Sequence, residues 1–213
     1  MHRTRIKICG IRRVEDALFA AQAGADAIGL IVHADSPRAI GIEDAIAVRQ
    51  ALPPFVSAVA LVVNADRSIV DRIVREVRPG LLQFHGAETA DFCASFAIPY
   101  LKAMGVTTGT AGTDLLKWQQ QYSTAAALLL DTGRDGKSGG TGTTFDWSVI
   151  PAEMRGRIVL AGGLNPANVG LAVRTVRPWA VDVSSGVESE TGRKDHAKIV
   201  AFIDQVREAD ANV

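Results

Sequence analysis

Short apolar runs of four to seven residues alternate along this chain with segments that have the spacing of amphipathic helices. A parallel βα array requires this alternation, because each buried strand is followed by a helix that crosses back over the sheet. Runs without polar residues, such as 128–130, suit strands that are buried on both faces. Eight runs can be counted, near residues 5–9, 27–32, 56–62, 81–84, 100–103, 126–131, 158–161 and 180–183.

The segments between these runs carry helix signals. Asn165 followed by Pro166 predicts a helix start, while Gly24 and Gly80 stand where helices should stop. Apolar stripes at helical spacing can cover a barrel from outside. Two such stripes are Ile69, Val70, Ile73, Val74 and Val77, and Ile199, Phe202, Ile203 and Val206.

Eight βα units in 213 residues predict a single (β/α)₈ TIM barrel, with one α/β domain over residues 1–213. The sixth unit is the least regular, since Pro151 and the scarcity of apolar residues leave only a short helix after Trp147. An open doubly wound sheet is the alternative fold, but it would usually need fewer strands in this length.

Charge and composition limit the possible partners. The chain has 23 basic and 23 acidic residues, so neither nucleic acid nor an anionic membrane is attracted electrostatically, and we expect a small-molecule partner. The two cysteines and a first strand beginning near residue 5 favour a cytoplasmic protein without a signal peptide or membrane span. The four histidines lack paired spacing, so we expect no metal mechanism.

Chemistry in such barrels gathers at the carboxyl ends of the strands, where Cys9, Asp131 and Ser184 are found. Cys9 ends a strand and shares a face of it with Lys7, whose ammonium would favour the thiolate. Cys93 lies inside a helical stretch, and we interpret it as a small buried apolar residue.

Closure of the barrel would make the first and eighth strands neighbours. Asp182 shares a face with Ser184 in the same way that Lys7 shares one with Cys9. An inward lysine is costly without a partner, so we predict a buried ion pair between Lys7 and Asp182.

Asp131 ends three consecutive leucines, and it is either a helix N-cap or a carboxylate of the site. No convincing helix begins at Thr132, and the glycine-rich segment 133–142 indicates a loop, which favours the functional interpretation. Gly136-Lys137-Ser138 matches the end of a P-loop. The first glycine of that motif is replaced by Asp131 and no long helix follows, so nucleotide binding fits poorly.

Glycine-rich loops provide backbone amides where barrels often hold phosphate, although most such loops only form turns. Arg38 could bind a substrate carboxylate as a bidentate fork, or be a solvated surface residue. His85, after the fourth strand, is either a second acid or base or a structural histidine. The candidate phosphate-binding residues are Gly140, Thr141, Gly142, Gly162, Gly163, Ser184, Ser185 and Gly186.

Several motifs occur together in a specific order. They are Lys7-Ile8-Cys9-Gly10, Asp35-Ser36-Pro37-Arg38, Gln83-Phe84-His85-Gly86, Leu130-Asp131-Thr132, Gly139-Gly140-Thr141-Gly142, Ala161-Gly162-Gly163-Leu164-Asn165-Pro166 and Val181-Asp182-Val183-Ser184-Ser185-Gly186-Val187-Glu188. With them the chain resembles the phosphoribosylanthranilate isomerases of tryptophan biosynthesis. The resemblance runs from about residue 5 to the last helix.

The resemblance implies an Amadori rearrangement of N-(5-phosphoribosyl)anthranilate to 1-(2-carboxyphenylamino)-1-deoxyribulose 5-phosphate, without a cofactor. Asp131 would be the general acid at the furanose ring oxygen, and Cys9 the general base at C2′. Arg38, His85 and Asp182 form the expected substrate-binding set, with Arg38 facing the anthranilate carboxylate. The expected partner is a phosphosugar, and the expected state is a monomer, with a dimer as the alternative.

Two other functions are considered. The related barrel isomerase of histidine synthesis uses two aspartates, and Cys9 argues against that reading. A barrel that binds phosphate but has lost catalysis would lack the acid or the base, and this chain has both candidates.

Overall fold

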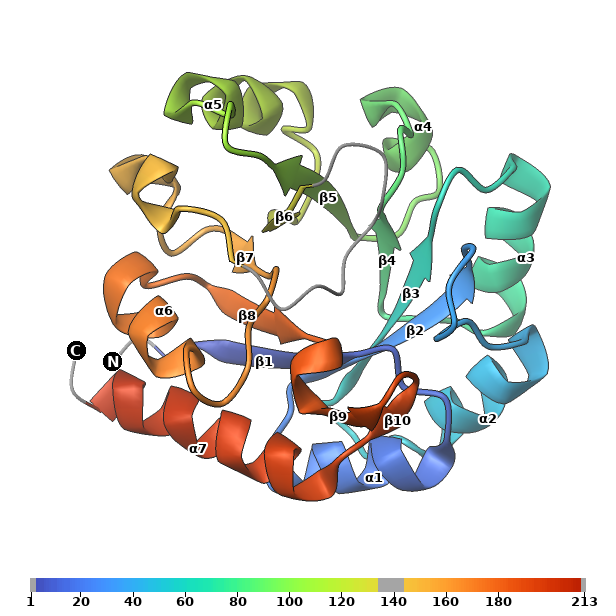
Figure 1. The fold of residues 1–213 in the computed structure, drawn as a ribbon. Helices are drawn as coiled ribbons and strands as arrows, with labels where there is room; N and C mark the ends of the chain where they lie inside the picture. Colours follow the sequence, from blue (N-terminus) through green and yellow to red (C-terminus); the bar gives the residue numbers. More distant parts are fainter. Residues whose placement is uncertain (1–2, 134–143, 212–213) are drawn as a thin grey trace.

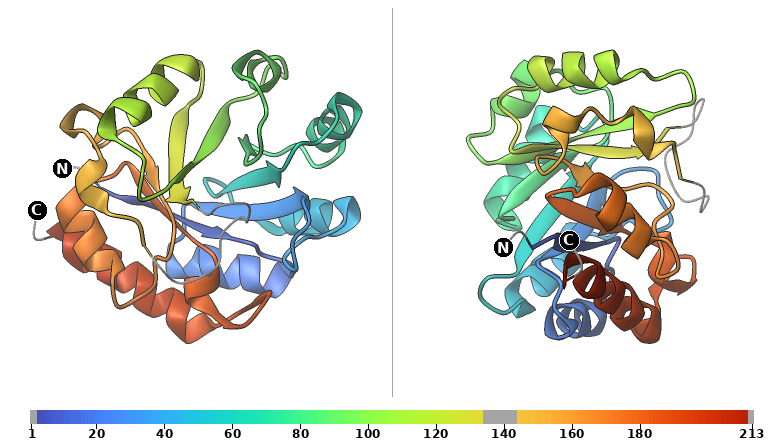
Figure 2. Two further views of the ribbon diagram at one scale, coloured as in Figure 1. Left: turned by 45° about the horizontal axis from the view of Figure 1, so that its top comes forward. Right: turned by 90° about the vertical axis from the view of Figure 1, so that its left-hand side faces the viewer.

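The computed structural model describes residues 3–133 and 144–211, and eight parallel strands in it close into a barrel with helices outside (Figures 1 and 2). The closed barrel confirms the predicted fold and excludes the open sheet. The strands are β1 (Arg5–Cys9), β2 (Ala27–His33), β3 (Ser57–Val62), β4 (Leu81–Phe84), β5 (Tyr100–Val106), β6 (Ala127–Thr132), β7 (Val159–Leu160) and β8 (Ala180–Val183).

The helices follow the strands in chain order and cover the outside of the ring. They are α1 (Val14–Ala23), α2 (Ile42–Ala51), α3 (Arg67–Glu76), α4 (Ala90–Ala94), α5 (Gly112–Gln121), α6 (Val169–Val176) and α7 (His196–Ala211). In the described part of the sixth unit, the helical elements are the 3₁₀ turns η1 (Trp147–Val149) and η2 (Ala152–Met154), which agrees with its predicted irregularity. After β8 come η3 (Ser185–Val187) and a small hairpin of β9 (Glu188–Glu190) and β10 (Arg193–Lys194).

Strands β8 and β1 pair in parallel and close the barrel, with Lys7 in register with Asp182. Helices α1 and α7 lie side by side outside this closure (Figure 1). The backbone N–H of Thr4, just before β1, donates to Asp210 of α7 at 2.8 Å. The first and last βα units are therefore joined by both the sheet and the helical layer.

Residues of each strand alternate between two apolar layers. Leu129 belongs to the cluster inside the barrel, whereas Leu128 and Leu130 belong to the cluster between the strands and the helices. This arrangement explains the three consecutive leucines, because a strand in a closed barrel is covered on both faces. The inner cluster is Val59, Leu101, Ala103, Leu129, Val159, Ala161 and Ala180.

Two predicted helix boundaries were wrong. Helix α6 begins at Val169, because Asn165 and Pro166 open a turn in which the Asn165 side chain accepts from the N–H of Ala167 at 2.9 Å. Helix α3 ends at Glu76 before Gly80, and the left-handed residue after it is Arg78, with φ of 53°. Gly24 does end α1 in the left-handed conformation, as predicted.

Among the residues described, no helix has the length and apolarity needed to cross a membrane.

We expect Leu130→Ala to lower the free energy of unfolding by about 2–5 kcal/mol, because it leaves a cavity at a fully buried position. Leu171→Ala is the matched control, since Leu171 on α6 is 56% exposed and its loss should change stability little. Urea unfolding of both variants measures the difference. Equal losses would contradict the two-layer packing.

Candidate active site

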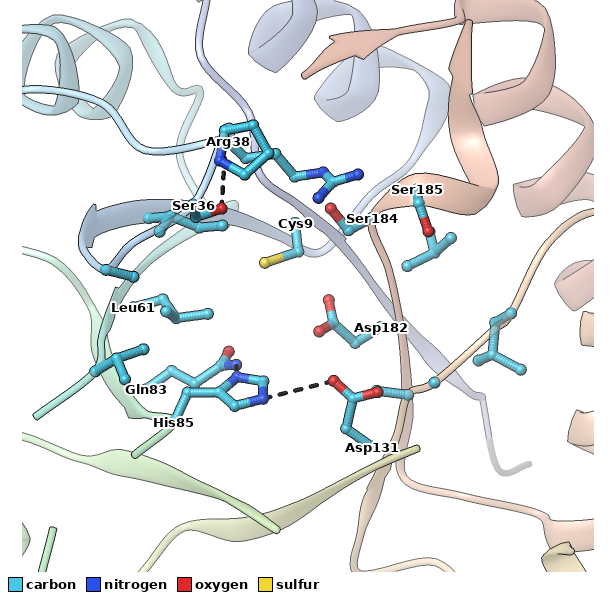
Figure 3. A pocket seen from close by; sticks show the side chains of 18 of the residues that line it. Cys9, Ser36, Arg38, Leu61, Gln83, His85, Asp131, Asp182, Ser184 and Ser185 are labelled. Carbon is cyan, nitrogen blue, oxygen red and sulfur yellow. Dashed lines mark hydrogen bonds and ion pairs between the residues drawn. The ribbon is translucent and has the colours of Figure 1, made fainter. Parts of the chain in front are cut away.

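A cavity of about 620 Å³ opens at the carboxyl ends of the strands, where the sequence places its candidate residues. Cys9 and Asp182 come from β1 and β8, and Asp131 comes from β6. His85 follows β4, and Arg38 lies in the loop after β2. Figure 3 shows these side chains around one space. Residues from nearly opposite ends of the sequence, such as Cys9 and Ser185, thus line a single cavity.

The predicted ion pair between Lys7 and Asp182 is present below this cavity. The Lys7 Nζ lies 2.9 Å from the Asp182 Oδ1, and the two side chains are 4% and 9% exposed. Burial lowers the pKa of the Lys7 ammonium, but Asp182 and Cys9 raise it, and the net shift is upward. Lys7 is therefore a fixed positive charge beneath the site.

Cys9 is only 5% exposed, and its ionisation differs from the sequence-based expectation. Burial raises the pKa of the thiol, Lys7 lowers it and Asp182 raises it, so that the net shift is upward. The ammonium thus favours the thiolate as expected, but desolvation outweighs it. Cys93, in α4, is buried as predicted.

Asp131 faces His85 across the cavity, with 3.5 Å between Asp131 Oδ2 and His85 Nε2 (Figure 3). Its other oxygen, Oδ1, accepts from the N–H of Thr132 at 2.8 Å. Burial and the nearby carboxylate of Asp182 raise the pKa of Asp131 to about 6. A carboxyl with this pKa exchanges its proton near neutral pH, which suits a general acid.

His85 is held neutral, because burial and the charge of Lys7 lower its pKa to about 4. Gln83 Nε2 lies 3.1 Å from the His85 Nδ1. When this amide donates to Nδ1, the proton of the neutral ring is on Nε2 and points at Asp131. The sequence analysis includes Gln83 in a motif but gives it no role, although its position two residues before His85 indicates that the two side chains point to the same face.

The loop that carries His85 is fixed by a second buried ion pair. The Lys102 Nζ lies 3.1 Å from the Glu88 Oε2 and also donates to the carbonyl of Gly86. Glu88 Oε2 accepts from the N–H of Gly86 at 2.9 Å, and Oε1 accepts from the N–H of Asn64 at 2.8 Å. The carboxylate therefore ties the loops after β3 and β4 together.

Arg38 lines the cavity, and its guanidinium forms a two-point ion pair that the sequence did not predict. Arg38 Nε donates to Glu188 Oε1 at 2.8 Å, and Nη2 donates to Oε2 at 2.7 Å. Lys194 Nζ also donates to Glu188 Oε1, at 2.9 Å. Arg38 is thus not the solvated surface residue of the alternative interpretation.

The loops after β7 and β8 approach the cavity closely. Gly162, Gly163, Ser184 and Ser185 line it. Gly162 has φ of 83°, and a Cβ there would lie 2.4 Å from the backbone nitrogen of Thr132. Glycine is therefore required where this loop passes the end of β6.

Gly186 does not contact the cavity but allows these two loops to pack. A Cβ at Gly186 would lie 1.9 Å from the carbonyl oxygen of Leu164, so any larger residue would separate the loops after β7 and β8. The predicted phosphate residues Gly140, Thr141 and Gly142 lie outside the described residues.

Within residues 3–133 and 144–211, no group of three or more His, Cys, Asp or Glu side chains could hold a metal ion.

A closed barrel with a polar cavity at the carboxyl ends of its strands is the arrangement found in (β/α)₈-barrel enzymes. The family model described as "N-(5'phosphoribosyl)anthranilate (PRA) isomerase" matches residues 6–205, and the chain belongs to this family.

Individual relatives can be aligned with this chain over nearly its whole length. The N-(5'-phosphoribosyl)anthranilate isomerase of Pseudomonas aeruginosa (strain UCBPP-PA14) is 53% identical over 207 residues, which cover 97% of each chain. The crystal structure of the phosphoribosyl anthranilate isomerase from Thermotoga maritima has a TM-score of 0.86 and 40% identity, covering 96% of this chain and 99% of that one. A phosphoribosyl anthranilate isomerase in complex with reduced 1-(o-carboxyphenylamino)-1-deoxyribulose 5-phosphate has a TM-score of 0.83, 40% identity and the same coverage.

We predict that Asp131→Asn stabilises the fold at neutral pH. The pKa of Asp131 is raised from 3.8 to about 6, so the folded state binds this proton more tightly and loses stability as the pH rises between these values. Removing the carboxyl should therefore raise the free energy of unfolding by up to about 3 kcal/mol at pH 7.5, and by less toward pH 4.

Urea unfolding at pH 5 and pH 7.5 tests this expectation. The lowered pKa of His85 has the opposite pH dependence, and its main causes, burial and Lys7, are the same in both proteins. Asp146→Asn, at an exposed carboxyl whose pKa is lowered by hydrogen bonds with Ser148, should show no such gain. A stabilisation of Asp131→Asn that is equal at both pH values would contradict the raised pKa.

Proposed function

We propose that this chain catalyses the Amadori rearrangement of N-(5'-phosphoribosyl)anthranilate to 1-(2-carboxyphenylamino)-1-deoxyribulose 5-phosphate, a step of tryptophan biosynthesis. Membership of the isomerase family supports this reaction. The observation that carries the mechanism is that a buried thiol and a carboxyl of raised pKa, Cys9 and Asp131, line the same cavity. Such a cavity offers an acid and a base to one sugar.

Asp131 is the proposed general acid. With a pKa of about 6, roughly a tenth of the carboxyl groups hold a proton at pH 7, compared with about a thousandth at the ordinary value. The proton passes to the furanose ring oxygen as the C1′–O bond breaks, which leaves a Schiff base cation and the Asp131 carboxylate. The Nε2–H of neutral His85, 3.5 Å away, can stabilise this carboxylate.

Cys9 is the proposed general base. Its thiolate removes the proton from C2′, and the electron pair of that C–H bond neutralises the Schiff base to give an enolamine. The enolamine then tautomerises to the ketone, and the thiol returns a proton to the medium. Lys7 supports this step, because its ammonium lowers the pKa of the thiol against the effect of burial.

The remaining residues are assigned to substrate binding. We propose that Arg38 pairs with the anthranilate carboxylate, and that the loops with Gly162, Gly163, Ser184 and Ser185 hold the 5′-phosphate through backbone amides and hydroxyls. Residues 140–142 and Gly186 are also assigned to phosphate binding. His85 and Asp182 line the same cavity, and we assign them to the sugar. The relative bound to a reduced deoxyribulose phosphate supports a phosphosugar ligand.

The reaction moves protons within one substrate, so we propose that it needs no cofactor. A cytoplasmic, monomeric protein stays our expectation. Light scattering of the purified chain measures the oligomeric state directly, and a mass of twice 22.6 kDa would establish the dimer instead.

We expect Cys9→Ala and Asp131→Asn each to lower kcat by about 10²- to 10⁴-fold, because each removes one proton-transfer group. Turnover of freshly generated phosphoribosylanthranilate, followed as loss of its fluorescence, measures the effect. Cys93→Ala is the control for the loss of a thiol outside the cavity and should keep the parental turnover. Near-normal turnover of either site variant would refute its role, and an inactive but folded parent would favour a non-catalytic barrel.

Arg38→Ala should mainly weaken substrate binding and raise KM by about 10- to 100-fold, the loss expected for a charge-assisted hydrogen-bonded pair. Steady-state kinetics separate this effect from a change in kcat. An unchanged kcat/KM would refute the contact with the carboxylate.

A further inference from the structure

The guanidinium of Arg38 has two edges that can donate hydrogen bonds to a carboxylate, and Glu188 occupies one of them. One edge consists of Nε and Nη2, and the other of Nη1 and Nη2. Glu188 accepts from Nε and Nη2 at 2.8 and 2.7 Å. Arg38 also lines the cavity, so its terminal Nη1/Nη2 edge is the one that it can offer to a ligand. Figure 3 shows this group beside Ser184.

Glu188 is a rigid anchor for Arg38. Its side chain is 4% exposed, and Lys194, with a side chain 1% exposed, donates to the same carboxylate at 2.9 Å. Lys194 also donates to the carbonyl of Ser184 at 3.0 Å, and Lys198 donates to the carbonyl of Glu188 at 2.7 Å. Both the carboxylate and the backbone of Glu188 are therefore held in place.

The charges of this cluster leave a surplus positive charge beside the cavity. Arg38 and Glu188 alone would neutralise each other. Lys194 adds a second cation to the same carboxylate, so the three residues carry a net charge of +1. Of the three, only Arg38 lines the cavity. An anionic group of a ligand is thus favoured at Arg38 although an ion pair already occupies its other edge.

Gly10 provides the space for this arrangement. It follows β1 with φ of 72°, and a Cβ there would lie 2.9 Å from both the Arg38 Cδ and the Ser184 Oγ. The Arg38 side chain therefore crosses the end of β1 with little freedom to move sideways. Its orientation depends on Glu188 at one end and on this close passage along its length.

We propose that Glu188 is a positioning residue that makes the site selective for an aromatic amine bearing a carboxylate, by fixing the terminal edge of Arg38 toward the cavity. The proposal rests on the carboxylate contact of Arg38 under the proposed function and names the residue that creates it. Lys194 takes part by keeping the cluster positive. The fork of Arg38 can then bind two carboxylates at once, one of the protein and one of the substrate.

The test compares two ligands that differ only in the carboxylate. One is reduced 1-(o-carboxyphenylamino)-1-deoxyribulose 5-phosphate, and the other is its counterpart made from aniline. The ratio of their Kd values, from titration calorimetry, is the selectivity. We expect the parent to prefer the first ligand by about 10- to 100-fold. Glu188→Gln should lower this preference by about 10-fold through weaker binding of that ligand alone, because the loss of the fixed orientation of Arg38 outweighs the added positive charge of the cluster.

Further variants make the result specific. Glu190→Gln, on the same hairpin but with a side chain 69% exposed, should keep the parental selectivity. Arg38→Met should abolish the selectivity, and Glu188→Gln should then have no further effect in the Arg38→Met background, because Glu188 acts only through Arg38. If Glu188→Gln does not fold, Glu188→Asp carries the same expectation, since it keeps the charge but is too short to reach both nitrogens.

Parental selectivity in a folded Glu188→Gln protein would overturn the proposal and leave Glu188 a structural residue. Parental selectivity in Arg38→Met would overturn the carboxylate contact itself, and with it this proposal. The isomerase activity is measured separately, so either result can be told apart from an error in the proposed reaction.

Discussion

The buried ion pair between Lys7 and Asp182 connects the closure of the barrel with its chemistry. It joins β1 to β8 at 2.9 Å, in register across the seam where the ring closes. Removing one partner of such a pair leaves an uncompensated buried charge, which typically costs about 3–5 kcal/mol. The same two charges act on the pKa values of Cys9 and Asp131. The geometry of the seam thus sets the electrostatics of the proposed base and acid.

Among the residues that the structure describes, three buried lysines near the cavity are each paired with a carboxylate. Their side chains are 4%, 2% and 1% exposed for Lys7, Lys102 and Lys194. Each pair holds a different part of the site. The first lies beneath the proposed base, the second fixes the loop of His85, and the third anchors Arg38 through its carboxylate. Buried ion pairs contribute little net stability, so their location here indicates a role in orienting polar groups.

Much of the fold follows from local patterns. The bounds of β1, β4 and β8 agree with the apolar runs, and the pairing of Lys7 with Asp182 follows from strand alternation once the barrel closes. Other features depend on contacts that no local pattern reveals. Arg38 and Glu188 are 150 residues apart. The place of Lys7 on the same strand face predicts that it favours the Cys9 thiolate, but the direction of the pKa shift depends on burial, which spacing does not measure.

The sequence by itself determined the eight repeated units, the barrel, and the residue types at the strand ends. These properties depend on periodicity, and a strand buried on both faces must be apolar whatever its neighbours are. Only the tertiary structure decided which edge of Arg38 is paired with Glu188, that His85 faces Asp131, and how strongly each acid or base is desolvated. Such properties depend on distances of a few ångströms between segments that are distant in the chain, and the electrostatic free energy changes steeply over those distances in a poorly solvated site.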